Sequence, residues 1–226
     1  MSDRRLQNDA ACREQGLNNP CLVVFVNSFF WRKGLKQLEE RILKDGQVLP
    51  GNIVKVGSFL NHCVDVSLLL DMGEEVKSLY ADEKITKILT VEASGIAIAT
   101  AFAVCMGVPV VFAKKYHSMN ISDNVYTAKV HSFTHDKDYN ICIEREYLSK
   151  DDCVLIVDDF LANGEALKGL LKITECAGAQ VAGCAIAIEK GFQKGGKELR
   201  EKGVRIESLA VIDSIDDGII KFRACS

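Results

Sequence analysis

Apolar runs and helical patterns alternate along the chain from residue 35 onward. Short runs rich in Val, Ile and Leu are typical of strands that are buried on both faces of a sheet. They lie at residues 87–91, 108–113, 139–143, 153–157, 180–188 and 204–212. Apolar positions at helical spacing predict helices at residues 35–43, 65–79, 96–106, 165–177 and 195–202. The last of these segments is more polar than the others. Strands that alternate with helices predict an α/β fold with a central parallel sheet flanked by helices.

Boundary signals support several of these elements. Asp65 is a candidate N-cap for the helix that follows it, because its carboxylate can accept a hydrogen bond from a free backbone N–H group. Gly46 and Gly107 follow helical patterns and are expected to end them. Residues 48–56 predict a turn between two short extended pieces.

The longest stretch without a helix or a continuous apolar run covers residues 114–139. It is polar, although apolar and polar positions alternate in its second half, at Val125, Thr127, Val130 and Phe133. Long polar connections between buried strands are usually disordered or serve as lids. We therefore predict an irregular, mobile lid over residues 114–139.

The first 34 residues do not follow the pattern of the rest. Residues 1–20 are polar, and residues 20–31 form one short, nearly apolar run. This run is too short to cross a bilayer, which takes about 20 apolar residues, and it lacks the plan of a secretory signal. We expect residues 1–34 to be a poorly packed extension ahead of one domain at residues 35–226. The alternative is that translation starts near Leu35.

The composition of the chain excludes several classes of function. Hydrophobic residues make up 48% and charged residues 26% of the 226 residues, which is ordinary for a globular protein. The net charge of −3 is unlike that of a nucleic-acid-binding domain. The nine cysteines are scattered, and none forms a Cys-x-x-Cys pair, so neither a zinc site nor a redox pair is predicted. Free thiols suit a reducing compartment, and we expect the cytoplasm.

The most informative stretch is residues 154–166, Val-Leu-Ile-Val-Asp-Asp-Phe-Leu-Ala-Asn-Gly-Glu-Ala. Four apolar residues predict a buried strand that delivers Asp158 and Asp159 to its carboxyl end. A short loop with Asn163 and Gly164 then begins a helix, whose first backbone N–H groups favour anions. Carboxylates beside an anion-binding loop suit a ligand with phosphate groups, hydroxyl groups and a metal ion.

Two further strand ends carry polar residues. One is Glu92-Ala93-Ser94-Gly95, and the other is Glu189-Lys190-Gly191-Phe192. Ligands of open α/β sheets bind at the carboxyl ends of the strands. The three ends together offer acids for ribose hydroxyls, amides for phosphate, and a cation with an aromatic ring for a flat polar base.

Residues 154–166 resemble the phosphoribosyl-pyrophosphate (PRPP) signature of the type I phosphoribosyltransferase family. From about residue 35 to the C-terminus, the chain is similar to the purine-salvage branch of that family that acts on xanthine. The resemblance is carried by residues 56–62 (Val-Gly-Ser-Phe-Leu-Asn-His), 91–96, 122–124, 158–164 and 188–190. Many type I members have Thr-Gly at the position of Asn163-Gly164, and Asn is usual in the xanthine branch. The resemblance implies the type I fold with a small hood, formed mainly by residues 46–64 and the C-terminal segment.

The activity implied by the resemblance is transfer of the 5-phosphoribosyl group from PRPP to xanthine, giving XMP and pyrophosphate. Asp158 and Asp159 would hold the ribose hydroxyls directly or through Mg²⁺, as binding groups more than proton-transfer groups. The residues expected to bind PRPP are Ala162, Asn163, Gly164, Glu165, Ala166, Ser94, Gly95, Lys114 and Lys115. The first five would hold the 5-phosphate, Ser94 and Gly95 the pyrophosphate, and the two lysines would neutralise it unless they form a solvated strand end. Relatives are homodimers, and neither a nucleic acid nor a membrane is an expected partner.

Hydrogen-bond donors indicate how the base is selected. Xanthine has carbonyl groups at positions 2 and 6, and Lys190, which only donates, favours a 6-oxo purine over adenine. Asn61 can donate to the second carbonyl, which hypoxanthine lacks. Val54 is the other base-contacting position of the family pattern, and Phe192 is a candidate stacking ring. The alternatives are that Asn61 caps a helix and that Phe192 belongs to the core.

Two other functions compete with xanthine transfer. A hypoxanthine or guanine phosphoribosyltransferase would use the same 6-oxo recognition, whereas the hood segment and Lys190 disfavour adenine. A PRPP-sensing purine repressor would share the fold but needs a DNA-binding module ahead of it. The region before the α/β core has mixed charge and no helix-turn-helix pattern, which makes the repressor the weaker reading.

Overall fold

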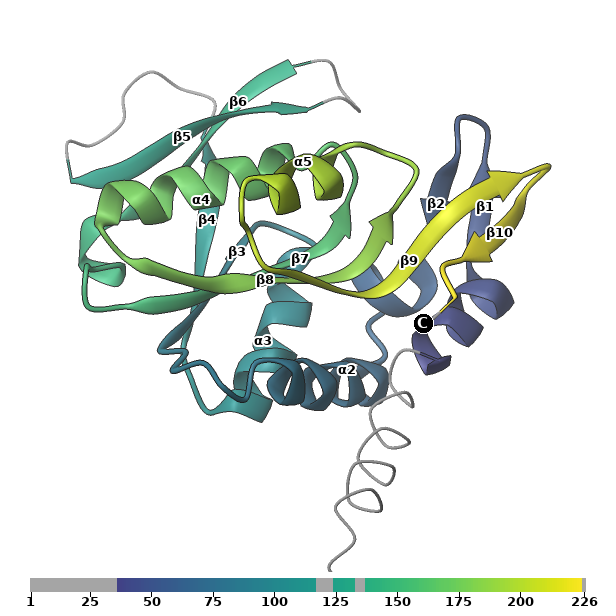
Figure 1. The fold of residues 1–226 in the computed structure, drawn as a ribbon, viewed down its shortest axis with the longest axis horizontal. Coiled ribbons are helices and arrows are strands. Elements are labelled where there is room, and N and C mark those ends of the chain that lie inside the picture. The colour runs from purple at the N-terminus through teal and green to yellow at the C-terminus, as the bar shows by residue number, and fades with distance from the viewer. Residues whose placement is uncertain (1–35, 117–123, 133–136, 225–226) are drawn as a thin grey trace, which may run out of the picture.

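The computed structural model describes residues 36–116, 124–132 and 137–224. An eight-stranded sheet forms its centre, in the order β10-β9-β8-β7-β3-β4-β6-β5 (Figure 1). The strands are β3 (Lys87–Val91), β4 (Val110–Tyr116), β5 (Val125–Ser132), β6 (Lys137–Glu144), β7 (Cys153–Leu161), β8 (Gln180–Lys190), β9 (Ile206–Asp216) and β10 (Ile219–Phe222). Strands β9, β8, β7, β3 and β4 are parallel, whereas β10 at one edge and β6 and β5 at the other are antiparallel to their neighbours. The predicted parallel centre is confirmed, and the whole sheet is mixed.

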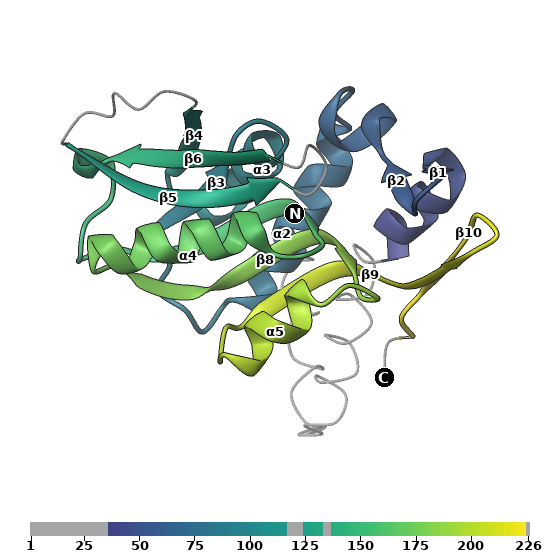
Figure 2. The same ribbon diagram turned by 90° about the horizontal axis from the view of Figure 1, so that it is seen from above.

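Helices cover both faces of this sheet (Figures 1 and 2). Helices α2 (Val66–Leu79) and α3 (Gly95–Met106) pack on one face, and α4 (Glu165–Ala177) and α5 (Gly195–Glu201) pack on the other. Each pair of helices shares an apolar cluster with the sheet. Because both faces are covered, β7 and β8 are almost continuously apolar, which is the pattern that predicted them.

The predicted helix boundaries are confirmed. Asp65 caps α2, and its Oδ1 accepts a hydrogen bond from the backbone N–H of Leu68 at 3.2 Å. Gly107 ends α3 with a φ of 71°, a left-handed conformation that glycine adopts without steric cost. The helix that includes residues 36–45 ends at Gly46, as expected.

The prediction of an irregular segment over residues 114–139 is wrong for most of the residues that the structure describes there. Strand β4 continues to Tyr116, and β5 and β6 form an antiparallel pair at the edge of the sheet. One face of this pair packs on α4 through Val130 and Ile141, and the other face is more exposed. An edge covered on one face needs only alternating apolar positions, which is why it reads as polar overall. Residues 117–123 and 133–136 lie outside the described residues, so a mobile lid stays a prediction.

The segments before α2 and at the C-terminal end pack together. Strands β1 (Gln47–Leu49) and β2 (Ile53–Lys55) form a hairpin, and the single π-helical turn η1 (Gly57–Asn61) follows it. The hairpin lies beside β9 and β10 in both ribbon views (Figures 1 and 2). Apolar residues of these segments share one cluster that also includes the ends of β8 and β9. The expected extension over residues 1–34 lies outside the described residues.

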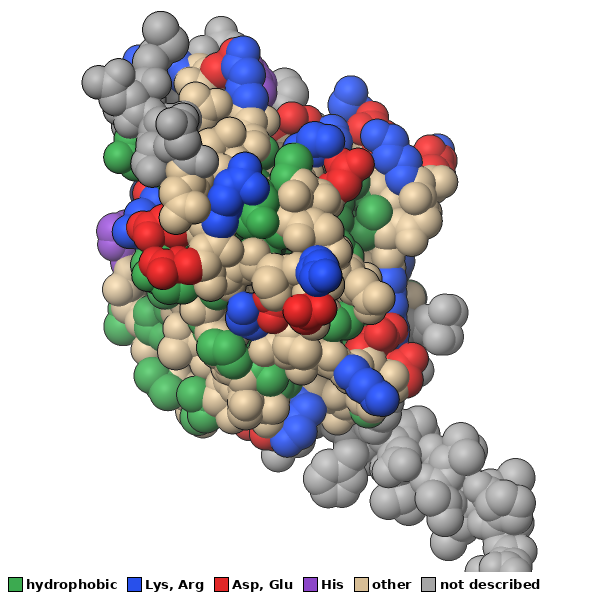
Figure 3. Space-filling view, turned by 90° about the vertical axis from the view of Figure 1, so that its left-hand side faces the viewer, with side chains coloured by type: hydrophobic (Ala, Val, Ile, Leu, Met, Phe, Trp, Pro, Cys, Tyr) green, Lys and Arg blue, Asp and Glu red, His purple; other side chains and the backbone are tan. Residues whose placement is uncertain are grey.

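The surface mixes charges of both signs. Figure 3 faces the end of the molecule at which β7 and β8 begin, and acidic and basic side chains are interspersed there. Within residues 36–116, 124–132 and 137–224, no helix has the length and apolar character needed to cross a bilayer.

Candidate active site

Two carboxylates lie at the carboxyl end of β7. Asp158 is only 6% exposed, and its Oδ1 accepts a hydrogen bond from the backbone N–H of Asp159 at 3.0 Å. Burial and the neighbouring charge of Asp159 raise the pKa of Asp158 well above its usual range. Asp159 is less buried, and its Oδ1 accepts from the backbone N–H of Phe160 at 3.0 Å. The pair concentrates negative charge that a cation would stabilise.

Side chains from two other elements lie beside these acids. Asn61, the last residue of η1, donates from Nδ2 to Asp159 Oδ2 at 3.4 Å. The positive charge of Lys115 on β4 acts to lower the pKa of Asp158, although burial has the larger, opposite effect. A candidate for binding the base and a candidate for binding the donor are thus adjacent, although 98 residues separate Asn61 from Asp159.

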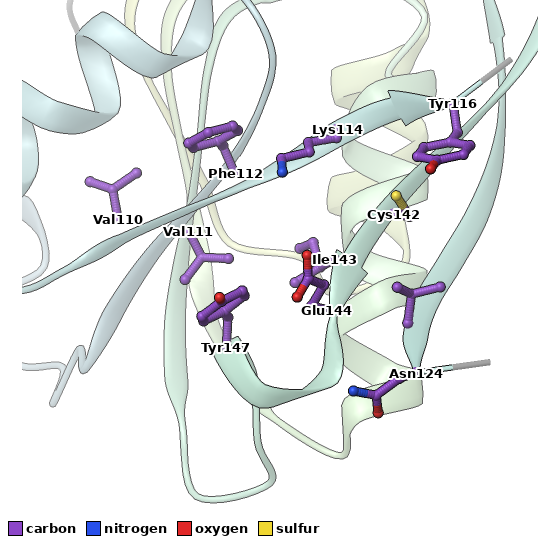
Figure 4. Close-up of a pocket in the computed structure, with 11 residues that line it drawn as sticks. Val110, Val111, Phe112, Lys114, Tyr116, Asn124, Cys142, Ile143, Glu144 and Tyr147 are labelled. Carbon is purple, nitrogen blue, oxygen red and sulfur yellow. The ribbon is translucent and has the colours of Figure 1, made fainter. Parts of the chain in front are cut away.

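The two neighbouring lysines of β4 point to opposite faces of the sheet, as successive strand residues do. Lys115 lies on the same face as Tyr139, with its Nζ 5.4 Å from the ring centroid. Lys114 instead lines a groove of about 590 Å³ with Phe112 and Tyr116 (Figure 4). The structure therefore brings Lys115, but not Lys114, to the acidic pair.

The loop after β7, residues 162–166, is called the phosphate loop below. It turns sharply at Gly164, where φ is 78° and an added Cβ would lie 3.2 Å from Leu199 Cδ1, so the position favours glycine. Helix α4 begins at Glu165, and the backbone N–H groups of its first turn have no carbonyl partner within the helix. The Glu165 carboxylate accepts a hydrogen bond from Lys168 Nζ at 2.8 Å. A turn rich in free amides at a helix start can bind an anion.

The loop after β3 packs directly against the acidic pair. A Cβ added at Gly95 would lie 2.2 Å from Thr90 Oγ1 and 3.5 Å from Asp158 Oδ1. Ser94 precedes α3 and makes no capping hydrogen bond through its side chain. Thr90 is fully buried, and its Oγ1 has no hydrogen-bond partner in the described part of the chain. The second predicted anion loop is thus next to the acidic pair.

The predicted base-binding residues differ in their exposure and in their hydrogen-bond partners. Lys190 ends β8 and donates from Nζ to the Asn52 carbonyl at 3.0 Å, and burial lowers its pKa. Phe192 is 39% exposed, so it is not a core residue. Val54 is 7% exposed and packs in the apolar cluster, so its side chain is not open to a ligand. Asn61 does not cap α2, because Asp65 does.

Sequence reasoning gave no role to Thr90 or to an ion pair with a buried carboxylate at the end of β8. Glu189 is 3% exposed and accepts two hydrogen bonds from Arg200, each at 2.7 Å. The available signal was an acid at the end of an apolar run, since a buried carboxylate requires a partner. Its partner Arg200 follows 11 residues later and is set by the packing of α5.

The acidic pair does not make a complete metal site by itself. In the parts of the chain that the structure describes, no cluster of three or more His, Cys, Asp or Glu residues could hold a metal ion. Asp158 and Asp159 supply two carboxylates at most. A divalent cation here would complete its coordination with ligand oxygens and water, which is how Mg²⁺ commonly binds.

Comparison with known families identifies the class to which this fold and site belong. Residues 72–216 match the family model described as a phosphoribosyl transferase domain, and the chain belongs to this family. Solved structures support the same fold. Adenine phosphoribosyltransferase from Giardia lamblia, complexed with 9-deazaadenine, is 21% identical with a TM-score of 0.65, covering 77% of this chain and 96% of its own. The enzyme from Rhodothermus marinus is 22% identical with a TM-score of 0.64, covering 79% and 98%.

Similar curated proteins carry one more specific name. Xanthine phosphoribosyltransferase of Ligilactobacillus salivarius is 52% identical over 189 residues, which are 84% of this chain and 98% of that protein. The protein of the same name from Lachnoclostridium phytofermentans is 52% identical over 191 residues, with the same coverage. That from Bacillus cytotoxicus is 50% identical over 188 residues, 83% of this chain and 95% of its own.

Proposed function

We propose that this protein transfers the 5-phosphoribosyl group from PRPP to xanthine in purine salvage, forming XMP and pyrophosphate. The observation that carries the proposal is the meeting of Asn61, a base-binding candidate, with Asp159 of the acidic pair. Relatives that are 50–52% identical over more than four fifths of the chain are named xanthine phosphoribosyltransferase, which supports the choice of base.

Different groups of the chain would bind each part of PRPP. Amides of the phosphate loop would hold the 5-phosphate at the start of α4. Ser94 and Gly95 would face the pyrophosphate, with Lys115 as the cation on the same side as the acids. Asp158 and Asp159 would hold the ribose hydroxyls and stabilise positive charge as it develops on the ribose. Water must be kept from such a reactive sugar, and the predicted lid would do so.

Mg²⁺ fits this arrangement. Asp158 and Asp159 provide two oxygen-bearing side chains with excess negative charge, and the phosphates of PRPP would supply further oxygen ligands. The ion would neutralise charge on the leaving pyrophosphate. Lys115 adds a fixed positive charge near the same acids.

The base site would recognise xanthine through hydrogen-bond donors. Lys190 would face the 6-oxo group and Asn61 the 2-oxo group, with Phe192 as the exposed ring beside them. The hairpin β1–β2 and strands β9 and β10, which pack together, would form the hood over the base. Val54 would belong to this hood as a predicted base-contacting position, although the residue is only 7% exposed.

Two properties of the whole molecule complete the proposal. We expect a homodimer, which sedimentation equilibrium of the full chain would check. We also expect the protein in the cytoplasm, and fractionation of the native cells would check this.

The test is an assay of the purified protein with PRPP, Mg²⁺ and each of xanthine, guanine, hypoxanthine and adenine. We expect the highest kcat/KM with xanthine and almost none with adenine. A preference for hypoxanthine or guanine would favour the alternative 6-oxopurine enzyme, and turnover of adenine alone would overturn the base assignment. Tight DNA binding without pyrophosphate release would favour the repressor.

A further inference from the structure

An ion pair between a buried carboxylate, Glu189, and a partly exposed guanidinium, Arg200, lies behind the phosphate loop. Arg200 on α5 donates from Nη1 and Nη2 to the two carboxylate oxygens of Glu189, each at 2.7 Å. The Ser208 hydroxyl donates to the same carboxylate. Two parallel hydrogen bonds fix both the distance and the direction between the two side chains. Strand β8 and helix α5 are therefore joined in one defined orientation.

The first turn of α5 fits between this ion pair and the phosphate loop. A Cβ added at Gly196 would lie 2.2 Å from Glu189 Oε1, so the helix backbone lies directly against the carboxylate. One residue earlier, a Cβ at Gly195 would lie 2.4 Å from Ala162 O and 2.6 Å from Gly164 N. The backbone N–H of Gly195 also donates to Ala162 O at 3.1 Å. Two adjacent glycines let α5 contact the ion pair on one side and the loop on the other.

Further contacts join the same elements. Leu199 of α5 lies against the position of Gly164, 3.2 Å from an added Cβ. Lys168 of α4 donates to Glu165 at 2.8 Å and to Glu198 of α5 at 3.5 Å. The phosphate loop is thus supported by α5 through backbone, apolar and charged contacts. A shift of α5 would move the backbone amides that the loop offers to an anion.

We propose that Arg200 is a positioning residue for the donor phosphate: through Glu189 it fixes α5 behind the phosphate loop and so sets the direction of the loop amides. This inference rests on the proposed function, in which that loop binds the 5-phosphate of PRPP. Arg200 would act through Glu189 and not by contact with PRPP. Lys190 follows Glu189 but points to the other face of β8, so the base site is not part of this effect.

The chain contains a matched control. Lys87 donates to Asp152 at 2.9 Å, and Asp152 is nearly as buried as Glu189. This second ion pair joins β3 and β7 at the ends where these strands begin. Arg200→Met and Lys87→Met each remove the cation of a buried carboxylate, so a purely structural role predicts the same consequences for both.

The test measures the melting temperature, kcat, and KM for PRPP and for xanthine in both variants. We expect both to melt at lower temperature, whereas only Arg200→Met raises KM for PRPP, by roughly 10- to 100-fold, because small misplacements of binding groups have effects of that size. Its KM for xanthine should stay within about twofold of wild type. Hydrogen exchange of residues 162–166 should be faster in Arg200→Met than in Lys87→Met.

Arg200→Lys keeps the charge but not the two parallel bonds, and it should show an intermediate KM for PRPP. If Arg200→Met does not fold, this variant and Ser208→Ala carry the test. Unchanged KM for PRPP in the folded variants, or an equal rise in Lys87→Met, would overturn the inference. Wild-type protein that neither binds nor turns over PRPP would refute the proposed function instead, so the two failures are distinguishable.

Discussion

A buried carboxylate lies at each end of the central sheet, and the pKa values of the two are shifted in opposite directions. At the end where β3 and β7 begin, Asp152 accepts hydrogen bonds from Lys87 Nζ at 2.9 Å and from the backbone N–H and hydroxyl of Ser149 at 2.8 and 3.0 Å. Thr86 adds a fourth donor at 3.1 Å. Burial alone would raise the pKa of Asp152, but these bonds together outweigh burial and lower it. The protein satisfies this charge by itself.

At the end where the parallel strands finish, Asp158 is about equally buried but far less satisfied. Its neighbour Asp159 adds a like charge, and the Asp159 backbone N–H and the charge of Lys115 do not outweigh the rise in its pKa. Nearby, the Thr90 hydroxyl has no partner among the described residues. Polar groups that are left unsatisfied inside a fold reduce its stability. Their concentration at one end of the sheet supports the proposed site, in which a ligand would complete these interactions.

The largest predicted effect comes from removing the unsatisfied charge. Asp158→Asn together with Asp159→Asn should raise KM for PRPP and lower kcat/KM by at least about 100-fold, because the groups that complement the donor are lost. Asp152→Asn should leave KM for PRPP unchanged. Steady-state assays of both variants compare the two ends directly, and similar kinetic losses in both would remove the distinction.

A steric change tests how closely the second loop approaches the acids. Gly95→Ala should lower kcat/KM by about 100-fold, since its Cβ would lie 2.2 Å from Thr90 Oγ1 and displace the start of α3. The double variant Gly95→Ala with Thr90→Ala removes the contacting hydroxyl and should recover most of the loss. Failure of the second substitution to restore activity would show that the close contact is not the cause.

Asn61→Ala tests the base-reading donor beside Asp159. It should lower kcat/KM for xanthine by about 10- to 100-fold more than for hypoxanthine, because leaving the buried 2-oxo group without a partner costs roughly 1–3 kcal/mol. Assays of both bases with each protein give the ratio. An equal loss for the two bases would mean that Asn61 acts through Asp159 and not on the base.

The smallest predicted effect is on the pH dependence of stability. The folded pKa of Asp152 lies below its ordinary value of 3.8, so its stabilisation is present above 3.8 and is lost as pH falls through the folded pKa. The folded pKa of Asp158 lies above 3.8, so stability declines as pH rises from 3.8 through that folded pKa. Urea unfolding between about pH 3 and pH 8 measures both.

Single substitutions separate the two contributions. Asp158→Asn should make the protein more stable near neutral pH and remove the decline, whereas Asp152→Asn should make it less stable there. The same sign of change in both variants at neutral pH would contradict the comparison between the two ends.

Local patterns explain which features were predictable. The α/β alternation, the Asp65 cap and the Asp158–Asp159 strand end depend on neighbouring residues, and the structure contains all three. Strand β5 lies where the sequence predicts an irregular lid, because one face of the β5–β6 pair is polar and exposed, whereas β6 includes the predicted strand at residues 139–143. The signal for a strand is that apolar Tyr126, Ala128 and Val130 alternate with polar Thr127 and Lys129, and the overall polarity of the segment obscures it.

Features that depend on tertiary packing could not be predicted from local sequence patterns. In the sequence, Lys114 and Lys115 are equivalent candidates for neutralising the pyrophosphate. Strand β4 includes both lysines, and a strand directs neighbouring side chains to opposite faces. The bond between Asn61 and Asp159 joins segments that are distant in sequence. Arg200 has no local signal, since its partner is fixed by where α5 packs.

The hydrogen bond from Lys190 to the Asn52 carbonyl has a thermodynamic consequence for recognition. Immobilising a lysine side chain costs on the order of 2 kcal/mol of rotamer entropy. Here folding has already restricted that side chain, by tying its ammonium group to the β1–β2 hairpin. The ammonium group carries three donors, so two remain after this bond. In the proposed base site, a purine would therefore meet an oriented group, and less of its interaction energy would be lost in ordering the protein.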